Sequence, residues 1–137
     1  MMKKINFKKA RVITLIALVL MASCAEESDL VIDTNSITGP AILTPTGGVD
    51  LELKIQDETK TATTIVWDGS KYGHNVEVTY TVQLAVAGTD FVEPIIAGQT
   101  SKTFYSWTVD QLNTFAIAAG LPAFQEGALE LRILSTV

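Results

Sequence analysis

The chain has 137 residues, of which 10 are basic and 15 acidic, and 47% are hydrophobic. Five basic residues lie within the first 11 positions, so the rest of the chain carries five basic against 15 acidic residues, a net charge of −10. Recognition of phosphate needs clustered lysine and arginine, and because these five are scattered, the sequence excludes nucleic acid and disfavours anionic lipid headgroups as partners.

The first 23 residues have the parts of a secretory signal. Basic residues are followed by an apolar run that ends at Ala22, just before Cys24, the only cysteine. The run is shorter than the roughly 20 residues that span a bilayer. Leu20 to Cys24 resembles the lipobox of bacterial lipoproteins, with Met21 where such boxes usually carry leucine. The resemblance implies a signal peptide over residues 1–23 and lipidation of Cys24 as the new N-terminus.

Residues 24–39 are predicted to form a flexible acidic tether. They contain four acids and show no sustained hydrophobic period. As flexible coil, about 14 residues reach roughly 20 Å root-mean-square, which would lift a domain off the lipid surface. Glu26 and Glu27 follow Cys24 closely and resemble the surface-export signal of Bacteroidetes lipoproteins. The alternative interpretation is that these two acids only solvate the tether.

Residues 40–137 are predicted to form one domain, because from residue 40 onward the hydrophobic period is two, which indicates strands with one buried face. The predicted strands cover residues 41–44, 49–56, 63–67, 75–86, 94–96, 102–107 and 129–133. Trp67 is expected in the core.

One helix interrupts the strands. Thr108 can cap it, Gln111 is the capping-box partner three residues later, and Gly120 with Pro122 ends it. Its apolar stripe should cover one end of the core. Short strands, frequent turns and a lone helix indicate an all-β fold, a β-sandwich with one short helix.

Four segments then come in a fixed order. They are VTYTVQL at 78–84, AGTDF at 87–91, WTVDQLN at 107–113 and LELRI at 129–133. In this order they resemble the N-terminal domain of SusE and SusF, the starch-utilisation outer-membrane lipoproteins of Bacteroidetes, from about Pro40 to the end. The resemblance implies an immunoglobulin-like or fibronectin-III-like sandwich, lipid-anchored at the outer membrane and facing the cell surface, in a glycan-capture complex.

In such proteins the starch sites lie in downstream domains, and the N-terminal sandwich acts as a spacer. No glycan-binding residue is therefore carried over. A sandwich of this type also has a further strand beside residues 129–133, and only 134–137 follow here. We expect the sandwich to lack its last strand, as a fragment of a longer protein would. The alternative is that another chain completes the sheet, because an unpaired edge accepts strands.

Aromatic residues are the candidates for direct glycan binding. Tyr105 and Trp107 share one strand face, as a two-ring platform would. Val109 continues the same phase into the helix, however, and this favours the core for both rings. Phe104 faces the other way and Tyr72 lies in a polar turn, so these two are expected to be exposed.

No catalytic set, metal ligands or cofactor site can be assigned. His74 is the lone histidine, and the strand acids Glu52, Glu77 and Glu130 occupy outward positions, where a solvated face accounts for them. The cysteine and histidine clusters that bind zinc and the acidic loops that bind calcium are both missing from the sequence. We therefore expect a non-enzymatic domain.

The expected function is that of an outer-membrane lipoprotein domain in a polysaccharide-utilisation system, serving as a spacer or scaffold for glycan binding. Its expected partners are membrane lipid through Cys24, polysaccharide, and other outer-membrane proteins of the system. Two alternatives stay open, namely direct glycan binding through exposed aromatics and a generic adhesion or envelope module.

Overall fold

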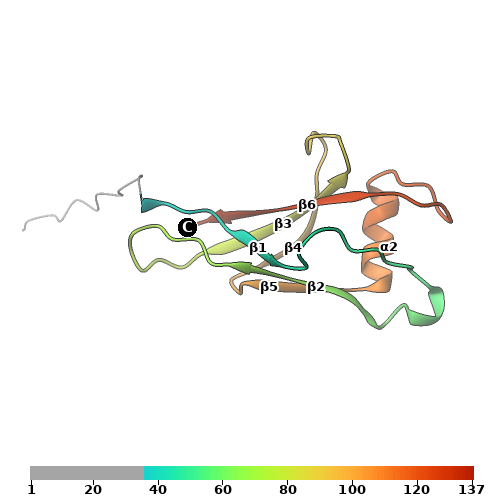
Figure 1. The fold of residues 1–137 in the computed structure, drawn as a ribbon, viewed down its shortest axis with the longest axis horizontal. Coiled ribbons are helices and arrows are strands. Elements are labelled where there is room, and N and C mark those ends of the chain that lie inside the picture. The colour runs from blue at the N-terminus through green and yellow to red at the C-terminus, as the bar shows by residue number, and fades with distance from the viewer. Residues whose placement is uncertain (1–35) are drawn as a thin grey trace, which may run out of the picture. The chain divides into compact units, whose positions relative to one another are not determined.

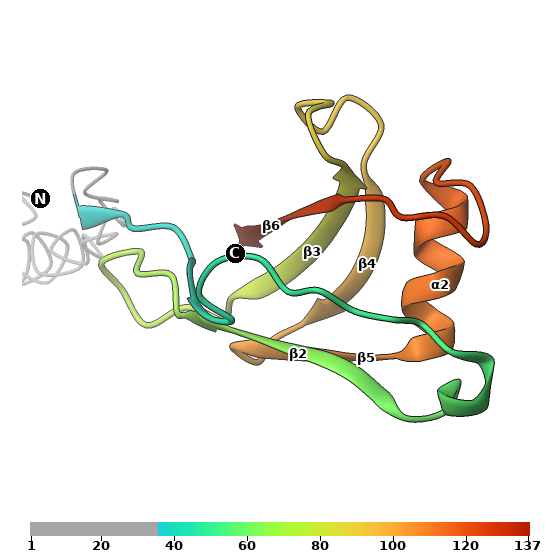
Figure 2. The ribbon, with the colours of Figure 1, turned by 45° about the vertical axis from the view of Figure 1, so that its right-hand side comes forward.

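The computed structural model describes residues 36–137, so the predicted signal peptide, Cys24 and most of the predicted tether lie outside the described residues. Two three-stranded antiparallel sheets, with orders β1-β2-β5 and β4-β3-β6, form two layers, and a helix lies at one end (Figures 1 and 2). The elements are β1 (Ala41–Thr44), η2 (Ile55–Asp57), β2 (Thr61–Asp68), β3 (Thr79–Val86), β4 (Ile95–Thr100), β5 (Phe104–Thr108), α2 (Val109–Ala118) and β6 (Leu129–Thr136). The predicted all-β sandwich with one short helix is confirmed. Its assignment to the immunoglobulin-like or fibronectin-III-like fold stays a prediction.

The core lies between the two sheets and is built from alternate residues of their strands. Trp67 is 1% exposed, which confirms its predicted place, and its ring meets that of Tyr80 edge-on at 5.4 Å between centroids. The Tyr80 hydroxyl accepts a hydrogen bond from the Ser70 amide, so this buried phenol is satisfied. The buried cluster consists of Ile65, Trp67, Tyr80, Val82, Leu84, Ala97, Trp107 and Leu112.

The central strand of the second sheet, β3, is shorter than predicted. Its register with β6 is unbroken from Thr79 opposite Thr136 to Val86 opposite Leu129. Strand β6 ends at Thr136, so within residues 36–137 no strand continues the ladder beyond Thr79. Residues 75–78, the predicted first part of this strand, are irregular although their apolar alternation continues.

The predicted strand at residues 49–56 is wrong. This stretch is coil up to residue 54 and then turns through η2. Val49 and Leu51 are 44% and 42% exposed, and Leu53 is the member of the alternating set that packs against the core. A period of two makes a strand possible, but the ladder needs a partner strand, and the described part of the chain places none beside this stretch.

The junction of β5 and α2 is as predicted. Thr108 Oγ1 accepts a hydrogen bond from the Gln111 amide, and Gln111 Oε1 accepts one from the Thr108 amide, which together form the capping box. The helix ends before Gly120, whose φ of 96° is accessible to glycine at little cost. Val109 and Leu112 are buried, so the helix covers one end of the core. Within residues 36–137 no helix is long and apolar enough to cross a membrane.

Candidate functional site

The two aromatic residues predicted to share a face of β5 do so, and that face points inward. Trp107 is 2% exposed, and its Nε1 donates a hydrogen bond of 2.8 Å to the carbonyl oxygen of Ala97. Ala97 is the extra residue of a bulge in β4, because Val82 pairs with Gly98 while Gln83 pairs with Ile96. The bulge takes the Ala97 carbonyl out of the β3 ladder, and the indole supplies the hydrogen bond instead, joining the two sheets.

Tyr105 is partly buried and packs beside Trp107, with ring centroids 5.2 Å apart and planes tilted by 45°. Its ring lies directly over the backbone of Gly98, where an added Cβ would overlap the ring carbons. Glycine at this position therefore makes room for the tyrosine between the sheets. Tyr105 and Trp107 together fill the core, and they present no flat pair of rings to a sugar.

Phe104 and Tyr72 come from different parts of the sandwich. Phe104 is 45% exposed on the outer face of β5, as expected, with the Lys102 ammonium nitrogen 5.4 Å from its ring centroid. Tyr72 is half-buried rather than exposed, because its hydroxyl donates a hydrogen bond of 2.7 Å to Ser135 Oγ in β6. The ring contacts among residues 36–137 join Trp67 to Tyr80 and Tyr105 to Trp107, so the structure does not combine Phe104 and Tyr72 into one aromatic surface.

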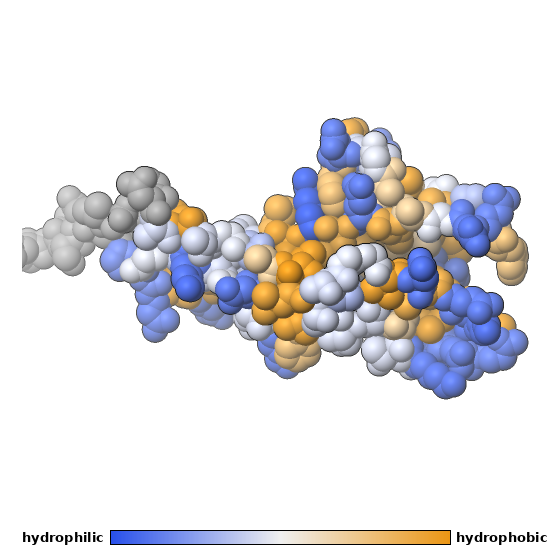
Figure 3. Space-filling view, viewed as in Figure 1, coloured by the Kyte–Doolittle hydropathy of each residue, from blue (hydrophilic) through white to orange (hydrophobic). Residues whose placement is uncertain are grey.

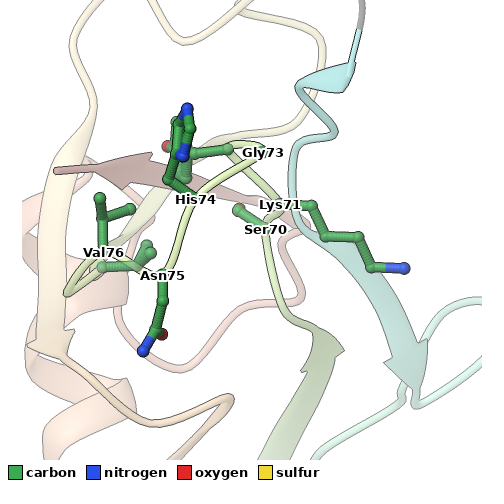
Figure 4. Close-up of a pocket in the computed structure, with 8 residues that line it drawn as sticks. Ser70, Lys71, Gly73, His74, Asn75 and Val76 are labelled. Atoms are coloured by element: carbon green, nitrogen blue, oxygen red, sulfur yellow. The ribbon is translucent and has the colours of Figure 1, made fainter. Parts of the chain in front are cut away.

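A shallow pocket of about 370 Å³ lies in the loop between β2 and β3 (Figure 4). The side chains of Lys71, His74 and Asn75 extend from it in different directions, so they do not converge on a common point. The Ser70 hydroxyl is buried and has no hydrogen-bond partner among the described residues. Sequence reasoning did not find this pocket, because the loop has the polar and glycine composition of an ordinary turn.

The three acids predicted at outward strand positions, Glu52, Glu77 and Glu130, are all exposed. Glu130 lies in a strand, β6, whereas Glu52 and Glu77 lie in coil. Glu52 is in an ion pair of 2.9 Å with Lys54, where a hydrogen bond and the nearby negative charge raise the pKa of the lysine. Over residues 36–137 no group of three or more histidine, cysteine or acidic side chains could hold a metal ion.

These features define a small β-sandwich domain whose large aromatic side chains mostly build the core. The sequence model of the SusE outer membrane protein family matches residues 26–134, and the chain belongs to this family. The match confirms the family expected from the four ordered segments and an outer-membrane location. Comparison with curated proteins and with solved structures gives no match.

Proposed function

We propose that the chain is a non-catalytic, lipid-anchored domain of a starch-type polysaccharide-utilisation system at the outer membrane, where it acts as a spacer and scaffold for glycan binding. The family match carries this proposal, because it extends from residue 26 to residue 134 and so covers all of the sandwich except the end of β6. In this proposal residues 1–23 are the signal peptide, 24–39 the tether and 40–137 the sandwich, with Cys24 as the lipid attachment point at the cell surface.

The burial of the aromatic residues favours a spacer over direct glycan binding. A sugar ring stacks on an aromatic face that is open to solvent, whereas Trp67 and Trp107 are 1% and 2% exposed. Phe104 in β5 is 45% exposed and Phe124, in the loop before β6, is 107% exposed, so these are the two rings that a glycan could reach most easily. Among residues 36–137 no ring contact joins Phe104 to Phe124, and exposed rings scattered singly over a protein surface do not by themselves make a site.

A spacer must also keep its shape, and the contacts between the two sheets support this role. The hydrogen bond from Trp107 to Ala97 joins β5 to β4, and Tyr105 packs against Gly98 across the same interface. Thr38, near the end of the predicted tether, and Lys71 exchange two backbone hydrogen bonds of 3.0 Å. These bonds fix the chain to the sandwich at residue 38, so the flexible part of the tether would lie before it.

Three measurements test this function. Labelling of cells with an alkyne fatty acid should mark the wild-type chain and not Cys24→Ala, and protease shaving of whole cells should remove the wild-type domain. Migration of the chain in gels that contain amylopectin should match migration in gels without it. If the chain is retarded by amylopectin and Phe104→Ala abolishes the retardation, direct glycan binding is established instead. If Cys24→Ala loses the label but stays attached to the membrane as the wild-type chain does, the lipid anchor is contradicted.

A further inference from the structure

Two phenylalanines of this domain have a backbone conformation that bulky residues rarely adopt. Phe91, in the loop between β3 and β4, has a φ of 54°, and Phe124, in the loop between α2 and β6, has a φ of 60°. This left-handed region is open to glycine but costs free energy for a residue with a Cβ. A residue in such a conformation is held there by its surroundings or serves a function. The two phenylalanines differ in what holds them.

Phe91 is held by contacts within the domain. The Val92 amide donates a hydrogen bond of 3.2 Å to the Thr89 carbonyl, so the chain turns tightly at Phe91. The ring then meets Arg132 of β6, whose guanidinium carbon lies 4.5 Å from the ring centroid. Because a guanidinium is attracted to an aromatic face, this contact compensates for the backbone conformation.

Phe124 has no comparable support among residues 36–137. At 107% exposed it is the most exposed large hydrophobic side chain of the described residues. It takes part in none of the ring contacts found there, with aromatic or with basic side chains. The domain therefore carries the cost of a left-handed phenylalanine and gains no packing from its ring.

The loop that carries this ring is fixed at both ends. At the end of α2 the Leu121 amide donates a hydrogen bond of 3.0 Å to the Ala116 carbonyl, and before β6 the Ala128 carbonyl accepts one of 3.0 Å from the Ala87 amide. The Leu121 side chain also packs on the backbone of Gly127, where an added Cβ would lie 2.8 Å from it. A ring presented by a fixed loop can bind with little loss of conformational entropy.

The surroundings of Phe124 are apolar. From residue 115 to residue 124 no side chain has a polar atom. In Figure 3 a hydrophobic group forms the right-hand tip of the domain, beside α2, between hydrophilic residues above and below it. The exposed members of this stretch are Ile117, Ala118, Gly120, Pro122, Ala123 and Phe124. An exposed apolar surface with a polar rim is typical of sites that bind another protein or a membrane.

The position of this tip argues against the membrane. The described chain begins at residue 36, at the opposite end of the sandwich from α2 (Figure 1). In the proposed attachment through Cys24, the tether therefore enters at the end away from Phe124. Residues 109–128 also contain no lysine or arginine, which membrane-binding surfaces commonly carry.

The chemistry of the tip favours a protein over a sugar or a second copy of this chain. A bound sugar needs polar groups placed beside the stacked ring, and the side chains of residues 115–124 supply none. The charged residues between 109 and 128 are Asp110 and Glu126, both exposed acids. A second copy would bring Glu126 against the same acid, whereas a surface with basic residues would complement it.

We propose that residues 121–126, together with Ile117, dock a partner protein at the cell surface. The partner offers an apolar pocket that receives the Phe124 ring and carries lysine or arginine at its rim. A buried aromatic anchor of this kind typically dominates the binding energy of an interface. The proposal rests on the scaffold role in the proposed function and gives that role a contact surface.

Photo-cross-linking in whole cells tests the docking with the full chain. The photoreactive residue p-benzoylphenylalanine replaces Phe124, and in the control it replaces Phe104, an exposed phenylalanine of β5. Position 124 should give one discrete adduct with another protein, and mass spectrometry should map it to an apolar segment flanked by lysine or arginine. Position 104 should not give this adduct. An adduct with lipid, with a second copy or within the same polypeptide, or no adduct, would overturn the proposal.

Substitutions measure what the ring and the acid contribute to the same adduct. With the photoreactive residue at the exposed Gln125, Phe124→Ala should lower the adduct yield about tenfold or more. Glu126→Lys should lower it about fivefold, because it removes the attraction to a basic rim. Glu77→Lys makes the same charge change at an exposed coil residue between β2 and β3, so it is the matched control and should leave the yield unchanged. Equal yields from Phe124→Ala and the wild-type loop would refute the role of the ring.

Melting temperatures separate loss of docking from loss of the fold. Phe124→Gly should leave the melting temperature unchanged or raise it by a few degrees, because glycine accepts this φ and no packing is lost. Phe91→Gly should lower it, because the contact with Arg132 is lost. If Phe124→Gly lowers it as much as Phe91→Gly, the ring supports the fold and the docking proposal fails. Fatty-acid labelling at Cys24 does not depend on this loop, so the proposed function can stand when docking fails.

Discussion

The two buried tryptophans offer a matched test of the hydrogen bond between the sheets. Trp67 and Trp107 are almost equally buried, so Trp67→Phe and Trp107→Phe remove similar apolar contacts. Their indole nitrogens differ. Trp107 Nε1 donates to the Ala97 carbonyl, whereas Trp67 Nε1 has no hydrogen-bond partner within residues 36–137.

The expected difference in unfolding free energy follows from these partners. Trp107→Phe leaves the Ala97 carbonyl buried and unpaired, since the bulge has already removed it from the ladder, and an unpaired buried acceptor costs about 1–3 kcal/mol. Trp67→Phe removes a buried donor that has no partner, which offsets part of the cost of the smaller ring. Trp107→Phe should therefore be the more destabilising change by about 1–3 kcal/mol.

Urea unfolding of the full chain, followed by circular dichroism, measures this difference. Each variant keeps one tryptophan, so its fluorescence gives a second probe, and coincident transitions would support two-state analysis. The slope of the unfolding free energy against urea concentration should be the same in both variants as in the wild-type chain, because unfolding exposes the same surface. Equal losses for the two variants, or a larger loss for Trp67→Phe, would refute the reasoning.

Three further changes test other parts of the packing. Trp67→Ala should cost about 3–5 kcal/mol in urea unfolding, as for other buried large-to-small changes, and a loss below about 1 kcal/mol would contradict its place in the core. Gly98→Ala should cost about 1–3 kcal/mol because its Cβ overlaps the Tyr105 ring, while Gly48→Ala, which meets no atom within 4 Å, is the control and should change little. Thr108→Ala should cost about 1 kcal/mol by removing the helix cap, and Thr108→Ser should recover most of it; an undiminished melting temperature in Thr108→Ala would show that the cap is redundant.

The sequence predicts best where the signal is local. The capping box at Thr108 needs only residues within one helical turn, and the helix begins and ends as expected. The inward orientation of Trp107 could also be predicted, because the strand alternation continues in phase into the buried Val109. Each of these features depends on neighbours in sequence, so a single chain is enough to identify it.

Features that depend on distant partners could not be predicted in the same way. Val49 to Ile55 alternate as a strand does, but pairing depends on what lies alongside, and that information is not in the local pattern. The bulge at Ala97 depends on how β4 pairs with β3, and the half-burial of Tyr72 depends on its hydrogen bond to Ser135, 63 residues away. The pocket in the loop between β2 and β3 could not be predicted either, because it depends on the path of the loop, and loop composition alone does not determine that path.

The start of α2 limits the chemistry available at its end of the sandwich. The amides of Val109 and Asp110 donate to the carbonyls of Lys60 and Glu58, and the Gln111 amide donates to Thr108. Free amides at such a position commonly hold phosphate, sulfate or carboxylate groups. Here the donors are already occupied, and the Asp110 carboxylate adds negative charge. Sulfated or uronic-acid sugars would find repulsion at this end, and uncharged ones would meet no such barrier.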